Sequence, residues 1–165
     1  SLSEADRATL TATLMASSKR MAALLDDLRR HAKASQKAGP GETALADALP
    51  MIEGLEIRVQ GDDPVPMPLD DLSAVLVQLA QNAHGHGADV FDVLWEGGRM
   101  VLADNGPGIA AGDRSRVFDP FFTTRRADGG TGMGLSIVRS LVMAHGGRID
   151  LLDPEKGTSF LISFD

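Results

Sequence analysis

The sequence predicts an α+β fold of two layers, in which a mixed, mainly antiparallel sheet is covered on one face by helices and preceded by a long N-terminal helix. Residues 3–37 contain neither glycine nor proline, which predicts the long helix. Beyond residue 41, short strand-like segments are interleaved with two apolar helical segments. Because strands are paired through glycine-rich turns, an antiparallel or mixed sheet is expected.

The segment Ala38-Gly39-Pro40-Gly41 ends the helix and divides the chain into an N-terminal part, residues 1–38, and a domain, residues 41–165. Glycine pairs at 97–98 and 146–147 mark a hairpin turn and the end of a helix. In order, the domain is expected to contain a strand at 57–60, a loop at 61–68, a helix at 69–83, strands at 89–95 and 99–103, a helix at 135–144, and strands at 148–152 and 158–164 around a turn at 153–157.

The N-terminal helix carries a narrow apolar seam. Its apolar residues alternate at spacings of four and three, with Ser17 in the remaining slot: Leu10, Leu14, Met21, Leu24 and Leu28. This spacing is typical of a helix about 50 Å long that pairs with another helix. We therefore expect it to pack against a second copy or a segment outside this chain. The alternative is that it folds back on the domain.

The composition excludes several classes of protein. The formal charge is -7 and no basic patch is visible, which argues against binding nucleic acid. There is no cysteine, so disulfides and thiolate metal sites are excluded. No apolar run approaches the roughly 20 residues of a membrane span. The expectation is a cytoplasmic chain, which could also be a piece of a longer, membrane-anchored parent.

Two glycine clusters predict a nucleotide site. DNGPGI, from Asp104 to Ile109, follows the apolar run at 100–103, and GTGMGL, from Gly130 to Leu135, opens an apolar helix. Glycines before a helix let backbone N–H groups approach phosphate oxygens, and the helix N-terminus favours anions. A carboxylate half buried at the end of a strand needs a donor, which an adenine amino group would supply. The alternative is that Asp104 bonds its own loop backbone.

Asn82 lies near the end of the 69–83 helix in an apolar stretch. Its amide oxygen could complete the shell of a magnesium ion that otherwise binds water and phosphate, or it could cap its own helix. The pair His84 and His86 lacks a third ligand at suitable spacing and is interpreted as loop residues.

Between the glycine clusters, residues 117–126 contain three phenylalanines and end in Arg125 and Arg126. The phenylalanines could anchor a lid that closes over a ligand, or they could be ordinary core residues. The two arginines are candidate partners of phosphate.

Five motifs follow one another along the chain: Asn82, the glycine cluster at 104–109, the phenylalanines at 118–122, the glycine cluster at 130–135, and Gly157-Thr158-x-Phe160. In this order they resemble the ATP-binding domain of sensor histidine kinases, a branch of the GHKL ATPases. The resemblance covers roughly residues 41–165 and implies that fold, ATP and Mg2+ as ligands, and a response regulator receiver domain as partner. By this resemblance, Asn82 is expected to bind magnesium and to act as a catalytic residue. Asp104 is expected to bind the adenine amino group, and Thr158 to support the Asp104 carboxylate through water. The nucleotide-binding residues expected by this resemblance are Asn82, His86, Asp104, Gly106, Gly108, Ile109, Phe122, Thr123, Thr124, Arg125, Gly130, Thr131, Gly132, Met133, Gly134, Leu135 and Thr158.

Residues 17–33 are similar to the second helix of the kinase dimerisation and histidine-phosphotransfer hairpin, which implies a homodimer in the full-length protein. The first helix, with its phosphoacceptor histidine, has no counterpart here. His31 is interpreted as a surface or seam residue, and His145 belongs to the AHGG turn.

Two positions depart from the family pattern. Gln78 replaces an acid that many relatives carry, and it remains a catalytic candidate although an amide cannot act as a general base. Gly85 falls where a lysine that contacts phosphate is common. The leading hypothesis is the ATP-binding catalytic fragment of a two-component kinase, which transfers the γ-phosphate to a histidine outside this chain. The alternatives are a non-catalytic scaffold for response regulators and a serine kinase or ATPase of the same superfamily.

Overall fold

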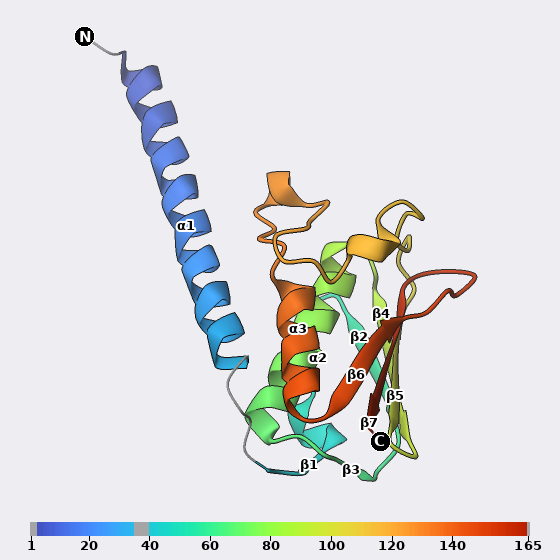
Figure 1. Ribbon diagram of the computed structural model, residues 1–165. Helices are drawn as coiled ribbons and strands as arrows, with labels where there is room; N and C mark the ends of the chain where they lie inside the picture. The colour runs from blue at the N-terminus through green and yellow to red at the C-terminus, as the bar shows by residue number, and fades with distance from the viewer. Residues whose placement is uncertain (1–2, 35–39, 165) are drawn as a thin grey trace.

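The computed structural model describes residues 3–34 and 40–164, with a long helix beside a two-layer α+β domain (Figure 1). Strands β2 (Glu56–Gln60), β4 (Val90–Glu96), β5 (Arg99–Asp104), β7 (Ser159–Phe164) and β6 (Gly147–Leu151) form one five-stranded sheet in that spatial order. The β2–β4 pair is parallel and the other pairs are antiparallel. The predicted mixed, mainly antiparallel sheet is confirmed.

Helices α2 (Leu69–Gly85) and α3 (Gly134–Ala144) cover one face of this sheet (Figure 1). Each presents an apolar stripe at helical spacing, and the stripes meet inward-facing residues of the strands. Leu76 and Val138 from the helices and Leu102 from β5 are completely buried. The core therefore lies between the helices and the sheet.

The β4–β5 hairpin turns where Gly97 and Gly98 were expected to form a turn. Both have positive φ, 55° and 77°, as a two-residue turn of type I′ requires. The hairpin register pairs Glu96 with Arg99 and Phe91 with Asp104. This register sets Asp104 at the end of the strand, where the turn carrying the first glycine cluster begins.

A hydrogen bond joins the two covering helices. His145, which follows the last residue of α3, places Nε2 2.9 Å from Oδ2 of Asp71 in the first turn of α2. The His145 side chain is only 5% exposed. The residue expected to belong to a turn thus also connects α3 to α2.

The segment before α2 was only partly predicted. A two-residue strand β1 (Thr43–Ala44) pairs antiparallel with β3 (Pro64–Val65), and a short 3-10 helix, η1 (Leu45–Ala48), follows β1. The loop expected at residues 61–68 therefore contains a short strand, which is a correction. A bridge of two residues is too short to show a periodic pattern.

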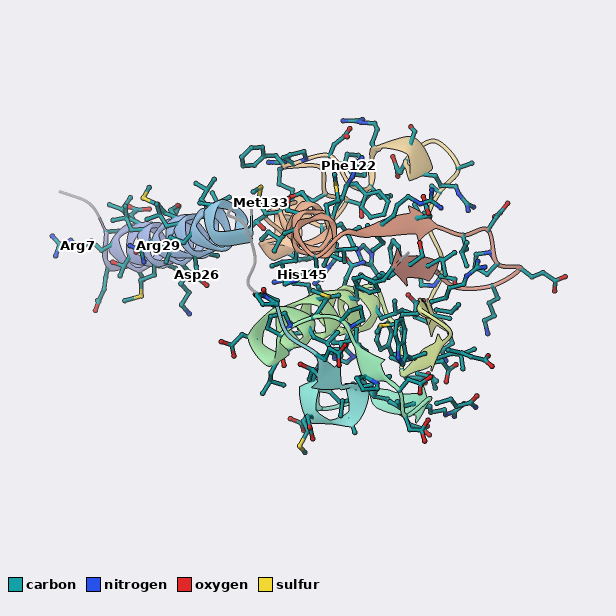
Figure 2. The ribbon with its side chains drawn as sticks, turned by 60° about the horizontal axis from the view of Figure 1, so that its bottom comes forward. Arg7, Asp26, Arg29, Phe122, Met133 and His145 are labelled. Carbon is teal, nitrogen blue, oxygen red and sulfur yellow. The ribbon has the colours of Figure 1, made fainter. Side chains whose placement is uncertain are left out.

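Helix α1 (Glu4–Ala34) packs against α3 with its C-terminal half, while its N-terminal half projects beyond the domain (Figures 1 and 2). Leu10, Leu14 and Met21 are more than half exposed, and Leu24 is half-buried. Most of the predicted seam is thus uncovered and only part of the helix meets the domain. Part of the predicted break at 38–41, and the side chain of His31, lie outside the described residues.

In the described part of the chain, no helix is both long and apolar enough to cross a membrane.

Leu76→Ala should lower the free energy of unfolding by about 2–5 kcal/mol, because Leu76 is 0% exposed and its truncation leaves a cavity. Leu94→Ala is the matched control. Leu94 is 40% exposed on the sheet face that the helices do not cover, and its loss should change stability by no more than about 0.5 kcal/mol. Urea unfolding of both variants measures this, and equal effects would contradict the assignment of the core to the α2 side.

Candidate nucleotide-binding site

A cavity of about 540 Å³ opens between α2, the β5 end and the loop that leads to α3. Its volume lies in the range of sites for small molecules and cofactors. Every predicted nucleotide-binding residue borders it except Gly106 and Met133, and Gln78 borders it too. The lining residues that the sequence did not predict are Ala23, Gln81, Ala110, Asp113, Val117 and Gly129.

Asp104 is held at one side of the cavity by two backbone N–H groups. Gly106 N donates to Oδ1 over 2.8 Å and Thr158 N donates to the same oxygen over 3.1 Å. The local alternative, in which Asp104 bonds its own loop, is thus part of the structure. These two hydrogen bonds occupy Oδ1 alone, since no described residue donates to Oδ2. The half-buried carboxylate therefore keeps one oxygen for a donor from a ligand.

The Asp104 turn packs on a second turn before β7. Asp104 N donates to Thr158 O over 2.9 Å, and a Cβ on Gly157, whose φ is 76°, would overlap Asp104 O. A Cβ on Gly108 would lie 2.9 Å from Gly157 O. The two turns can approach this closely only because both positions are glycine.

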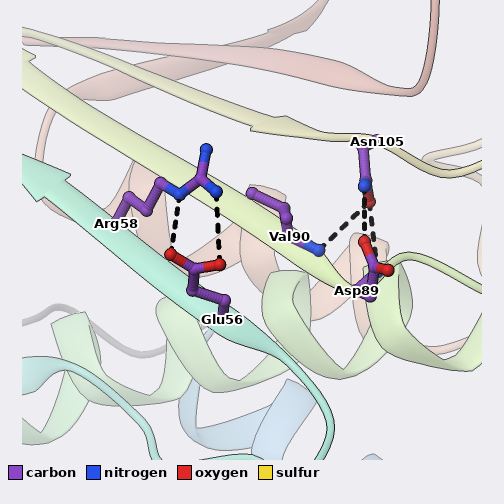
Figure 3. Close-up of polar contacts among 5 residues, drawn as sticks. All are labelled: Glu56, Arg58, Asp89, Val90 and Asn105. Atoms are coloured by element: carbon purple, nitrogen blue, oxygen red, sulfur yellow. Dashed lines mark hydrogen bonds and ion pairs between the residues drawn. The ribbon is translucent and has the colours of Figure 1, made fainter.

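Asn105 anchors the same turn to the start of β4 (Figure 3). Its Oδ1 accepts N–H bonds from Asp89 and Val90, each 3.1 Å long, and its Nδ2 donates to the Asp89 carboxylate. Asn105 supports the site without bordering the cavity.

Figure 3 also shows the exposed Glu56–Arg58 pair on β2, in which the guanidinium lowers the pKa of Glu56.

The cavity is also lined by the N-terminus of α3 and by the second glycine cluster. Helix α3 begins at Gly134, and the first-turn N–H groups of a helix have no partner inside it. Gly132 has a φ of 74°, and a Cβ there would lie 2.8 Å from the Phe121 Cα. Phe121 itself has a φ of 67°, unusual for a bulky residue, and its N–H donates to Gly132 O. The loop is thus folded tightly against the glycine cluster.

The three phenylalanines of this loop have different environments. Phe118 packs on the core with its ring 6.0 Å from that of Phe160, whereas Phe121 is 50% exposed. Phe122 is half-buried, borders the cavity and has the Arg116 guanidinium 4.6 Å from its ring centroid. The core interpretation thus holds for Phe118, whereas a lid role for Phe121 and Phe122 stays a prediction.

Gly106 and Met133 do not border the cavity, and their expected contact with a nucleotide stays a prediction. Gly106 is buried behind Asp104 and donates to its carboxylate. Met133 is 1% exposed and belongs to the core, and its main-chain oxygen accepts the Ser136 hydroxyl. Both positions therefore stabilise the site from behind.

Helix α2 presents amide side chains to the cavity. Asn82 is half-buried, and its side chain makes no hydrogen bond with the described residues, so it does not cap its own helix. A free amide oxygen in a cavity suits Mg2+, which keeps few protein ligands. A Cβ on Gly134 would lie 2.8 Å from Gln78 Oε1, so Gln78 abuts the start of α3. Within the described residues no three His, Asp or Glu side chains cluster as metal ligands.

Comparison with known proteins establishes the family. Residues 67–165 match the family described as histidine kinase-, DNA gyrase B-, and HSP90-like ATPase, and the chain belongs to this family. It is 33% identical to the C4-dicarboxylate transport sensor protein DctB of Rhizobium meliloti, covering 88% of this chain and 26% of that protein. It is also 33% identical to the sensor histidine kinase ZraS of Escherichia coli, covering 66% and 25%. The resemblance to sensor histidine kinases is confirmed.

The chain spans about a quarter of the length of these curated relatives. Among solved structures, full-length ShkA in complex with AMPPNP is similar with a TM-score of 0.69 at 23% identity, covering 98% of this chain and 39% of ShkA. This likeness confirms the fold.

His86→Gln should weaken the pH dependence of stability. Partial burial of the ring and then the charge of Arg125 lower the pKa of His86, while Asp104 opposes them. The unfolded chain therefore takes up this proton first, so the free energy of unfolding falls as pH drops from about 6.5 towards the folded-state pKa. Urea unfolding at pH 7.5 and 5.5 measures the change. Equal changes in parent and variant would contradict it.

Proposed function

We propose that this chain is the ATP-binding catalytic part of a two-component sensor histidine kinase, which transfers the γ-phosphate of Mg-ATP to a histidine outside this chain. The observation that carries the proposal is the cavity, which is lined both by a carboxylate and by a helix N-terminus with a glycine turn. A purine triphosphate has a matching polarity, with amino donor at one end and anion at the other. Membership of the ATPase family and the AMPPNP bound to the similar ShkA support it.

At the adenine end, Asp104 Oδ2 would accept the exocyclic amino group. Oδ1 is already fixed by Gly106 and Thr158, so the carboxylate is oriented before a ligand arrives. Thr158, on the cavity wall, supports the carboxylate through its main chain, whereas the expected water-mediated contact of its side chain stays a prediction.

At the phosphate end, the first turn of α3 and the glycine backbone would receive the anion. Thr131 and Arg125 border the same region. Asn82 would hold Mg2+, which when bound neutralises charge between the phosphates. The remaining predicted contacts, from Ile109 and the Phe122 to Thr124 segment, would enclose the ribose and the base.

In the proposed reaction, the bond between the terminal phosphorus and the β–γ bridging oxygen breaks, ADP leaves, and a bond to an imidazole nitrogen forms. The imidazole proton passes to solvent or to a base outside this chain. Gln78 lies against the start of α3 and cannot take up that proton, but it can hold an N–H donor towards phosphate. Because positioning and charge neutralisation dominate phosphoryl transfer, Gln78 is compatible with transfer.

The partners follow from the same proposal. A phosphohistidine made with this domain would pass its phosphoryl group to a receiver domain, and the relatives named as sensor kinases support that role. The exposed seam of α1 would pair in a homodimer of the full-length protein, because Leu10, Leu14 and Met21 otherwise face solvent. Nucleic acid is not proposed as a partner, and the cytoplasm is the proposed compartment because ATP and receiver domains are available there.

Asp104→Ala should weaken binding of Mg-ATP by roughly 10- to 100-fold, the loss of one hydrogen bond to a charged group. Asp92→Ala, on the exposed side of β4, is the matched control and should bind as the parent does. Isothermal titration with ATP and GTP measures both, and the parent should prefer ATP because guanine lacks the amino group at that position. Unchanged ATP affinity in Asp104→Ala would refute the adenine assignment.

Transfer itself is tested by mixing the protein with radiolabelled ATP and a separately expressed sensor-kinase hairpin that carries the acceptor histidine. Label on the hairpin, stable to base and labile to acid, is the expected result. Binding of ATP without any transfer, in a mixture where a known kinase domain labels the same hairpin, would favour the non-catalytic scaffold instead.

A further inference from the structure

The last residue of α2, Gly85, lies under the guanidinium of Arg125. A Cβ built on Gly85 would overlap Arg125 Nη1 and lie 2.8 Å from Cζ. Gly85 has no positive φ, so its backbone does not require glycine. The only described demand on this position is the space that the Arg125 side chain occupies.

Arg125 is well anchored for this contact. Its N–H donates to Thr123 Oγ1 over 3.0 Å, and its carbonyl accepts the N–H groups of Asp128 and Gly130. Its Nε lies 3.9 Å from Asp128 Oδ2, an exposed and long ion pair that contributes little to holding the guanidinium. The loop backbone thus fixes where the side chain starts, and the guanidinium ends beside Gly85 of α2.

The end of α2 is a favourable place for a cation. The C-terminus of a helix carries partial negative charge, and Gly85 is its last residue. Arg125 borders the cavity together with Asn82 and His86, and its charge contributes to the lowered pKa of His86. The guanidinium therefore lies at the cavity wall between the loop and α2.

We infer that Gly85 is a positioning residue, whose missing side chain seats the Arg125 guanidinium against α2 so that the loop supplies the cation for the triphosphate. This deepens the proposed function and rests on it. Because the charge comes from the loop rather than from α2, binding of the phosphates and ordering of residues 119–130 are coupled. An adenosine without phosphates would not use this contact.

The test is Gly85→Ala. A structural role alone predicts a gain in stability, since alanine is the better helix former. The inference also allows a maintained or raised melting temperature, but it predicts in addition that affinity for Mg-ATP falls roughly 10- to 100-fold, as for one lost charge-assisted contact. Affinity for adenosine should change by less than about twofold. Titration calorimetry with both ligands, and thermal unfolding, give these values.

Two further variants make the result specific. Gly112→Ala is the matched control, because nothing lies within 4 Å of a Cβ at that position, and it should bind ATP as the parent does. Gly85→Ala combined with Arg125→Ala should bind ATP no more weakly than Arg125→Ala alone, since both changes remove the same contact.

The outcomes separate the inference from the proposed function. If the parent protein does not bind ATP, the proposed function fails. If the parent binds ATP and Gly85→Ala binds it equally well, or loses ATP and adenosine to the same extent, the inference fails while the proposed function stands. Additive losses in the double variant would also overturn it.

Discussion

The site depends on one carboxylate that two backbone turns fix in place. Asp104 ends β5, and its Oδ1 accepts N–H groups from its own turn and from the turn before β7. Strand pairing between β5 and β7 brings these turns together, and the glycines at 108 and 157 let their backbones touch. The position of the half-buried carboxylate therefore depends jointly on the sheet register and on the residues of the two turns. A shift of β5 by one residue would point this carboxylate to the other face of the sheet.

Much of the fold could be predicted because its long elements are strongly patterned. Helix α2 was expected at 69–83 and observed at Leu69–Gly85, and the β4–β5 hairpin follows from Gly97 and Gly98. The β1–β3 pair could not be found, because two residues show no period and their pairing is set by contacts with the core. The parallel pairing of β2 with β4 likewise depends on how α2 crosses the sheet, which local sequence does not encode.

The candidate site could be predicted where residue types close together in the sequence indicate nucleotide binding. The glycine clusters and Asp104 can be recognised from their composition and position in the sequence. Most of the residues expected to bind the nucleotide border one cavity. Gln81 and Asp113 carry no motif and reach the cavity only through tertiary packing. Gly106 and Met133 belong to the motifs but do not border the cavity, because Gly106 is buried against the Asp104 carboxylate and Met133 is 1% exposed in the core. The different environments of the three phenylalanines are likewise set by tertiary packing.

Helix α1 forms part of the cavity rim. Ala23 borders the cavity, and the same part of α1 packs along α3, whose first turn faces the ligand space. A straight helix moves as a rigid rod, so sliding it by one turn displaces Ala23 by about 5.4 Å. Such a displacement would open or narrow the entrance without altering any residue that faces the purine. If affinity for a ligand differed between two axial positions of this helix, occupancy and position would bias each other to the same degree.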